Sequence, residues 1–266
     1  MKFLLYNLGV ALIQLTIFTS ISLPKIGHTE MLDNKVSAPP LTLRQSDQVK
    51  RIIKQYLQEN PEIILDSVQK LRERQKDIAN GQILQNLTTY KELILNDPTS
   101  PVAGNPKGDV TVVEFFDYSC GYCKRIFPNL KKLINEDKNI RFVFKELPIL
   151  SPQSELAARA ALAAWRQDKT KYMEVHSEFM NLKGRFSETR VLRIAKNKGL
   201  NLNELTKDMN SVTIDNTIKG NRQLAQKLNI TGTPGFVIGN NIIPGAVKLE
   251  TLKKIIADVR KKKVAG

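Results

Sequence analysis

The segment 110–123 is Val110-Thr111-Val112-Val113-Glu114-Phe115-Phe116-Asp117-Tyr118-Ser119-Cys120-Gly121-Tyr122-Cys123. Its first seven residues are a near-continuous β-branched and aromatic run, which is typical of a central strand covered on both faces. Apolar residues at helical spacing follow the second cysteine, and a further strand pattern occupies 140–144. The segment therefore predicts a strand–helix–strand unit with two cysteines at its first turn.

Cys120 and Cys123 are the only cysteines among 266 residues. A structural disulfide across so short a loop would remove little chain entropy. A structural zinc site usually needs four ligands, and the chain adds only His28 and His176 to the cysteines, so we predict no metal site. Two thiolates can hold copper(I), which leaves a copper-binding alternative open. Redox chemistry explains the pair best.

The position of Cys120 supports this interpretation. Unpaired backbone N–H groups and the helix dipole favour a thiolate at the start of a helix. We therefore predict that Cys120 is the nucleophile. Cys123, one turn into the helix, would then resolve the mixed disulfide.

The segment that follows Pro148 has a helical pattern over a long stretch, to about residue 228. Strand patterns return at 236–238 and 242–243, on either side of a Gly-Asn-Asn turn, and a last helix is expected at 249–260. The order is strand–helix–strand, several helices, and then two strands and a helix.

The N-terminus predicts export. Met1 and Lys2 precede a long apolar run, and Ser20-Ile21-Ser22 has the small-x-small pattern of a cleavage site. We therefore expect a signal peptide at residues 1–22 and a periplasmic protein. The apolar run is long enough that a membrane-anchored form is the alternative.

Residues 41–97 predict an N-terminal helical extension that ends at a Pro-rich boundary. Ile64, Leu71 and Ile78 repeat every seven residues, which is the spacing of a coiled-coil seam, although Gln75 and Gln82 interrupt it. Two interpretations stay open: a helix packed on its own domain, or a region that holds a homo-oligomer together.

The net charge of +15 raises the question of nucleic-acid binding. The Lys and Arg residues are spread along the chain without a recognisable nucleic-acid motif, and export would separate the protein from the genome. We expect no nucleic-acid partner and a basic surface suited to anionic membranes or acidic partners.

A second motif, Thr231-Gly232-Thr233-Pro234, stands directly before the predicted hairpin. Together with Glu114 to Lys124, with Phe144-Lys145-Glu146-Leu147-Pro148 and with the helical insertion, it gives the chain a resemblance to the DsbA family of the thioredoxin superfamily. The resemblance covers roughly 106–260. It implies an α/β thioredoxin fold with a helical insertion at about 152–228, within a domain of residues 101–262, preceded by the N-terminal helical extension.

The resemblance also implies roles for individual residues. Cys120 attacks, Cys123 resolves, and the two form a reversible disulfide without any cofactor. Pro234 is expected to be cis, with Thr233 lining the peptide groove beside Gly121 and Tyr122. Glu114 matches a buried acid of the family, which implies a proton relay near Cys123. The alternative for Glu114 is a hydrogen-bonded structural acid.

The dipeptide between the cysteines departs from the best-known oxidase of the family, which has Pro-His there. Tyr122 brings no cation, so we expect a less stabilised thiolate and a less oxidising disulfide. Gly-Tyr, Thr233 and the extension are instead similar to the suppressor-of-copper-sensitivity and isomerase-like members. Oxidase and isomerase or reductase activity both stay open.

The implied partners are exported substrate proteins with cysteines and a membrane thiol oxidoreductase, either DsbB-like or DsbD-like. The competing class is a non-catalytic or copper-binding envelope protein on the same scaffold.

Overall fold

The computed structural model describes residues 40–264, and the signal peptide expected at 1–22 lies outside them. Within the described residues no helix is both long and apolar enough to span a membrane. The chain divides into two compact units, the first ending at Ile63 and the second beginning at Ile64. Each unit is described separately.

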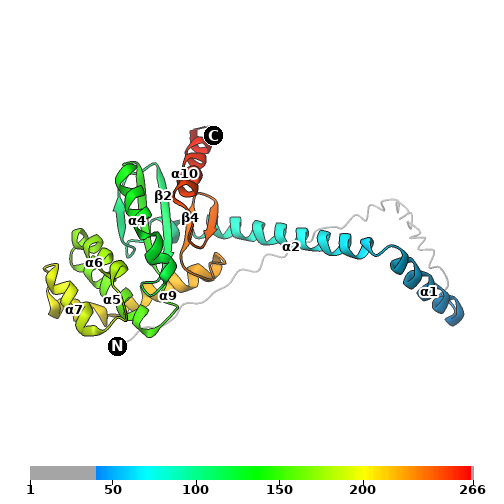
Figure 1. Ribbon diagram of the computed structural model, residues 1–266, viewed down its shortest axis with the longest axis horizontal. Coiled ribbons are helices and arrows are strands. Elements are labelled where there is room, and N and C mark those ends of the chain that lie inside the picture. The colour runs from blue at the N-terminus through cyan, green and yellow to red at the C-terminus, as the bar shows by residue number, and fades with distance from the viewer. Residues whose placement is uncertain (1–39, 265–266) are drawn as a thin grey trace, which may run out of the picture. The chain divides into compact units, whose positions relative to one another are not determined.

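The second unit is built on one sheet, which within residues 64–264 has five strands in the order β1-β3-β2-β4-β5 (Figure 1). The strands are β1 (Val102–Gly104), β2 (Val110–Phe116), β3 (Ile140–Glu146), β4 (Gly235–Ile238) and β5 (Asn241–Pro244). β2 is the central strand, parallel to β3 and antiparallel to β4. β4 and β5 form the predicted hairpin.

The two faces of the sheet carry separate apolar clusters because alternate residues of a strand point to opposite sides. Val112 and Phe116 of β2 belong to a cluster that also holds the two cysteines and residues of the helices on that face. Val113 and Phe115 belong to a second cluster with residues of helices α2 and α9. By this alternation Glu114 points toward the face that holds the cysteines.

The helices of the second unit pack on this sheet or on one another. They are α2 (Glu62–Thr89, which begins at the end of the first unit), α3 (Lys91–Leu95), α4 (Gly121–Glu136), α5 (Pro152–Gln167), α6 (Lys169–Asn181), α7 (Glu188–Asn197), α8 (Leu202–Met209), α9 (Val212–Lys227) and α10 (Leu249–Val264). The five helices α5 to α9 lie between β3 and β4 in the chain and form the insertion. The expected fold class, a thioredoxin fold with a helical insertion and an N-terminal helical region, is confirmed.

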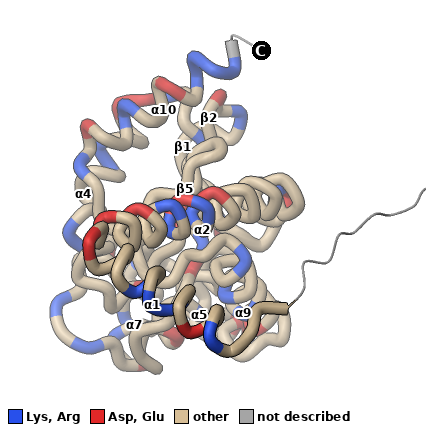
Figure 2. The backbone as a smooth tube through the Cα atoms, turned by 90° about the vertical axis from the view of Figure 1, so that its right-hand side faces the viewer, with Lys and Arg blue, Asp and Glu red and all other residues tan. Residues whose placement is uncertain are grey.

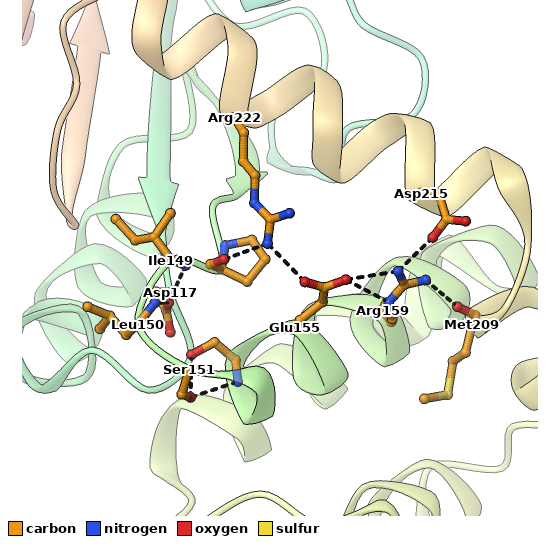
Figure 3. A network of polar contacts seen from close by, with 11 residues as sticks. Asp117, Ile149, Leu150, Ser151, Glu155, Arg159, Met209, Asp215 and Arg222 are labelled. Carbon is orange, nitrogen blue, oxygen red and sulfur yellow. Dashed lines mark hydrogen bonds and ion pairs between the residues drawn. The ribbon is translucent and has the colours of Figure 1, made fainter.

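Charged side chains fix the insertion to the end of β3 (Figure 3). Glu155 of α5 forms salt bridges of 2.9 Å with both Arg159 and Arg222. Arg222, on α9, also donates to the carbonyl oxygen of Pro148. Arg159 pairs with Asp215 of α9 at 2.6 Å. The network joins α5, α9 and the segment after β3, next to the site described below.

The N-terminal helices leave much apolar surface open. α1 (Leu43–Glu59) begins with a capping box between Thr42 and Gln45 and has no buried residue. In α2 the repeat residues Ile64, Leu71 and Ile78 are all exposed. The later part of α2 does join the core, since its Leu87 is buried there.

Two short elements were not predicted. β1 lies within a segment rich in turn residues, and its three residues pair with β3 at the edge of the sheet. α3 has only five residues. Neither is long enough to show a hydrophobic period.

Candidate active site

The two cysteines lie where β2 passes into α4. Cys120 is the N-cap of α4, and its Sγ accepts a hydrogen bond of 3.5 Å from the backbone N–H of Cys123. Both thiols are free and buried. Gly121 and Tyr122, between them, are exposed to solvent. The dipeptide therefore faces the outside while the reacting sulfurs stay largely covered.

The two thiols have opposite acidities. The pKa of Cys120 is lowered to about 5, first by a hydrogen bond from the Cys123 thiol and also by the backbone N–H groups of Cys123 and Tyr122. The pKa of Cys123 is raised by its hydrogen bond to Cys120, by burial and by the charge of Glu114. The helix terminus thus contributes as expected, but the neighbouring thiol contributes most. At neutral pH the pair is one thiolate and one thiol.

Glu114 is fully buried, and burial raises its pKa to about 8, with a further contribution from the charge of Cys120. Neither of its carboxyl oxygens has a hydrogen-bond partner among the described residues. A structural acid would be expected to have such partners, because a buried polar group without them costs free energy. The arrangement instead suits a group that gains and loses a proton.

The loop before β4 lies against Cys120. The Thr233–Pro234 peptide bond is cis, as expected from the sequence. The Sγ of Cys120 lies 3.2 Å from the carbonyl oxygen of Thr233, to which it donates a hydrogen bond in its thiol form, and the contact brings together residues that are 113 positions apart. The structure thus gathers Glu114, Cys120, Cys123 and Thr233 at one end of the sheet.

Asp117 was not singled out from the sequence. Its carboxylate accepts hydrogen bonds from the backbone N–H groups of Ser119, Ile149 and Leu150, at 2.7 to 3.0 Å. Figure 3 shows Asp117 beside Ile149 and Leu150. It therefore joins the loop that carries Cys120 to the start of the insertion. The signal in the sequence was an acid placed directly after a buried strand.

The sequence patterns also did not predict a buried cluster of polar side chains, which Tyr118, Glu146, Tyr172 and His176 form. The hydroxyl of Tyr118 lies 2.8 Å from Nδ1 of His176, and the hydroxyl of Tyr172 donates to Glu146 at 3.0 Å. Burial lowers the pKa of His176 to about 3 and raises that of Glu146 to about 8. Both side chains are therefore mostly uncharged at neutral pH, as suits a network inside an apolar core.

A thiolate at a helix start, a resolving thiol one turn later and a cis-proline loop opposite them define the class of thioredoxin-fold thiol–disulfide oxidoreductases. Residues 111–257 match the family model of the DSBA-like thioredoxin domain, and the chain belongs to this family. Residues 45–77 match a second model, the N-terminal domain of the copper resistance protein ScsC.

Solved structures support the assignment. A thioredoxin-like oxidoreductase from Silicibacter pomeroyi is 45% identical, with a TM-score of 0.61 over 64% of this chain and 97% of that one. A linker-deletion variant of ScsC from Proteus mirabilis is 27% identical, with a TM-score of 0.65 over 85% of this chain and 100% of that one.

Curated relatives match over part of their length. Disulfide bond formation protein D of Bacillus subtilis is 26% identical over 59% of this chain and 75% of its own. A Na(+)/H(+) antiporter of Salinispora arenicola is 28% identical over 58% of this chain, which spans 24% of that much longer protein.

Proposed function

We propose that the protein is an exported oxidoreductase that forms, reduces or isomerises disulfides of other exported proteins through Cys120 and Cys123. The observation that carries the proposal is the opposite acidity of the two thiols, with the pKa of Cys120 lowered to about 5 and that of Cys123 raised. A thiolate attacks disulfides, whereas a thiol does not. The first attack on a substrate is therefore assigned to Cys120.

In the reducing direction, the Cys120 thiolate attacks one sulfur of a substrate disulfide, and the other substrate sulfur leaves as a thiolate. Cys123 then loses its proton and attacks Cys120, which closes the enzyme disulfide and releases the second substrate thiolate. Two electrons pass from the enzyme to the substrate. Oxidation of a substrate dithiol follows the same steps in reverse.

Glu114 serves as the proton relay of this cycle. Its carboxylate form accepts the proton of Cys123 when that thiol attacks. Its acid form returns a proton when Cys123 leaves as a thiolate. A pKa of about 8 keeps both forms accessible near neutral pH.

The acidity of Cys120 bears on the direction of exchange. A pKa of about 5 lies between the values of about 7 for thioredoxin and about 3.5 for the oxidase DsbA. A thiolate stabilised in this way both attacks and leaves readily, which serves isomerisation as well as oxidation. Alkylation of the thiols in cells tests this: a mostly reduced pair indicates an isomerase or reductase, and a mostly oxidised pair indicates an oxidase.

Covalent trapping tests the proposed activity. In an extract of exported proteins, a Cys123→Ala variant should accumulate mixed disulfides that a reductant releases. A matched Cys120→Ala variant should accumulate none. If neither variant traps a protein and the wild type neither forms nor reduces a test disulfide, the proposal is refuted. Copper(I) binding without exchange would then favour the copper-binding alternative.

Residues 1–22 would direct this protein to the periplasm. There a membrane thiol oxidoreductase, DsbB-like for an oxidase or DsbD-like for an isomerase, would restore the working redox state of the cysteines. A relative described as a periplasmic thioredoxin-like protein from Salmonella, 29% identical, supports this location. Cell fractionation with and without residues 1–22 tests it.

The N-terminal helices would hold a homo-oligomer together. The support is the exposure of Ile64, Leu71 and Ile78, whose seven-residue spacing puts them along one stripe of α2. In an oligomer, several active sites could hold one misfolded substrate at once, which raises the effective concentration for reshuffling.

Light scattering tests the assembly. A Leu71→Gln/Ile78→Gln variant should lose mass relative to the wild type and should isomerise a scrambled-disulfide protein more slowly. The matched control is Arg74→Gln/Lys76→Gln, which changes exposed polar residues of the same helix. A wild type that is already monomeric at micromolar concentration refutes the assembly and leaves the oxidoreductase proposal standing.

A further inference from the structure

A surface pocket of about 860 Å³ opens beside the two cysteines. Ser119, directly before Cys120, and Lys124, directly after Cys123, line one side of it. The rest of the lining comes from the segment 180–186, which is the end of α6 and the loop toward α7, and from Ser151 and Gln153. A molecule joined to Cys120 would therefore lie within reach of this pocket, which the exchange steps above do not use.

The pocket is basic. Lys124, Lys183 and Arg185 line it, and Arg190 lies behind the segment 180–186. None of these four cations forms a salt bridge with any residue described between 40 and 264. Elsewhere basic residues are spread over several elements, α4 and α10 among them (Figure 2).

Backbone contacts hold these cations in place. Nζ of Lys124 donates to the carbonyl oxygen of Leu182 at 2.5 Å and lies 5.3 Å from the centre of the Phe186 ring. Arg190 donates to the carbonyl oxygens of Lys183 and Arg185, at 2.9 and 2.7 Å. Hydrogen bonds from Lys124 and Arg190 therefore hold the segment 180–186 in place. The side chains of Lys183 and Arg185, which belong to this segment, are exposed at the pocket.

The positive charge in this pocket is only partly balanced from within the protein, by Asp117. The pKa of Lys124 is lowered, first by burial and then by the charge of Arg190. The nearby acid is Asp117, whose carboxylate oxygens already accept the backbone N–H groups described above. An anionic group brought in from outside would relieve this repulsion.

We infer that this pocket is a subsite for acidic side chains that flank the reacting cysteine of a substrate protein. The inference rests on the proposed exchange at Cys120 and adds the class of substrate that the site prefers. Opposite charges at such a surface mainly raise the rate of encounter and select the partner. The preference should accordingly weaken as salt rises.

Peptide kinetics test the inference. Three peptides carry the same intramolecular disulfide and differ only in flanking residues, which are acidic, neutral amide or basic. Each is mixed with the reduced full-length enzyme, and the second-order rate constant of its reduction is measured. The acidic peptide should react about three- to tenfold faster than the neutral one, as expected for a pair of exposed ion contacts, and the basic peptide should react more slowly still.

A charge-matched pair of variants locates the effect. Lys183→Gln/Arg185→Gln should reduce the acidic preference to less than about twofold while leaving the rate for the neutral peptide unchanged. The control variant Lys261→Gln/Lys262→Gln removes the same charge from α10. These lysines follow Arg260, which forms a salt bridge with Asp109. Asp109 directly precedes β2, at the opposite end of that strand from Cys120. This control should keep the preference.

Equal rates for the acidic and neutral peptides would overturn the inference. So would an unchanged preference in the pocket variant, or an equal loss in the control. The failure of the proposed function is different, because then none of the three peptides would be reduced at all.

Discussion

Replacing Glu114 with glutamine should remove a large pH dependence from the stability of the catalytic domain. Burial raises the pKa of Glu114 from 4.5 to about 8, so between these values the folded state holds a proton that the unfolded state has lost. This stability is fully present below about pH 4.5 and is lost as the pH rises through about 8. Each unit of pKa difference is worth about 1.4 kcal/mol. Relative to Glu114→Gln, the wild type should therefore lose about 3.5 kcal/mol between about pH 5 and pH 8.

The assay is denaturant unfolding of both proteins in the reduced state, followed by the fluorescence of Trp165, the single tryptophan. Glu146 is also buried with a pKa raised to about 8, but it is present in both proteins and cancels in the difference. Glu188→Gln, a change at an exposed acid, is the matched control and should follow the wild type. Wild-type and Glu114→Gln stabilities that stay parallel across this pH range would refute the assignment of Glu114 as a buried acid that titrates.

Three further changes have defined outcomes. In a stopped-flow assay, Glu114→Gln should slow the resolution of a preformed mixed disulfide by about tenfold or more without slowing the first attack; equal effects on both steps would contradict the relay. Tyr122→His should lower the pKa of Cys120 by about one unit, seen in alkylation rates against pH, since Tyr122 is exposed and a cation there favours the thiolate. Asp97→Asn should destabilise the fold by about 3–5 kcal/mol, because Lys145, whose side chain is 1% exposed, would lose its 2.7 Å partner. Adding Lys145→Met should restore most of this stability, and a double variant as unstable as the single one would refute the explanation.

The central strand, the hairpin and the reacting thiols could be predicted from local patterns. A run such as 110–116 indicates a covered strand by itself, and a cysteine at the following helix start needs no tertiary knowledge to be assigned as a nucleophile. The burial of Glu114 followed from the same strand pattern. Its lack of hydrogen-bond partners did not, because this depends on which side chains the second strand and the helices place around it.

Contacts between distant segments could not be predicted in the same way. Tyr118 and His176 are 58 positions apart, and their apolar surroundings indicate burial without naming a partner. The basic pocket likewise needs Lys124 and the segment 180–186 to meet, which only the folded insertion achieves. Glu146, an acid at the end of a strand that is almost entirely buried, was the sequence signal that more than packing was required there.

Exchange at this site depends on the different acidities of the two thiols, because one attacks the substrate and the other resolves the mixed disulfide. The direct measurement is alkylation of the reduced protein across the pH range, with each modified cysteine identified by mass spectrometry of its peptide. Cys120 should react with a midpoint near pH 5, while Cys123 stays unmodified to well above neutral pH. A midpoint for Cys120 near the ordinary thiol value of about 8.5, or modification of Cys123 first, would contradict the account.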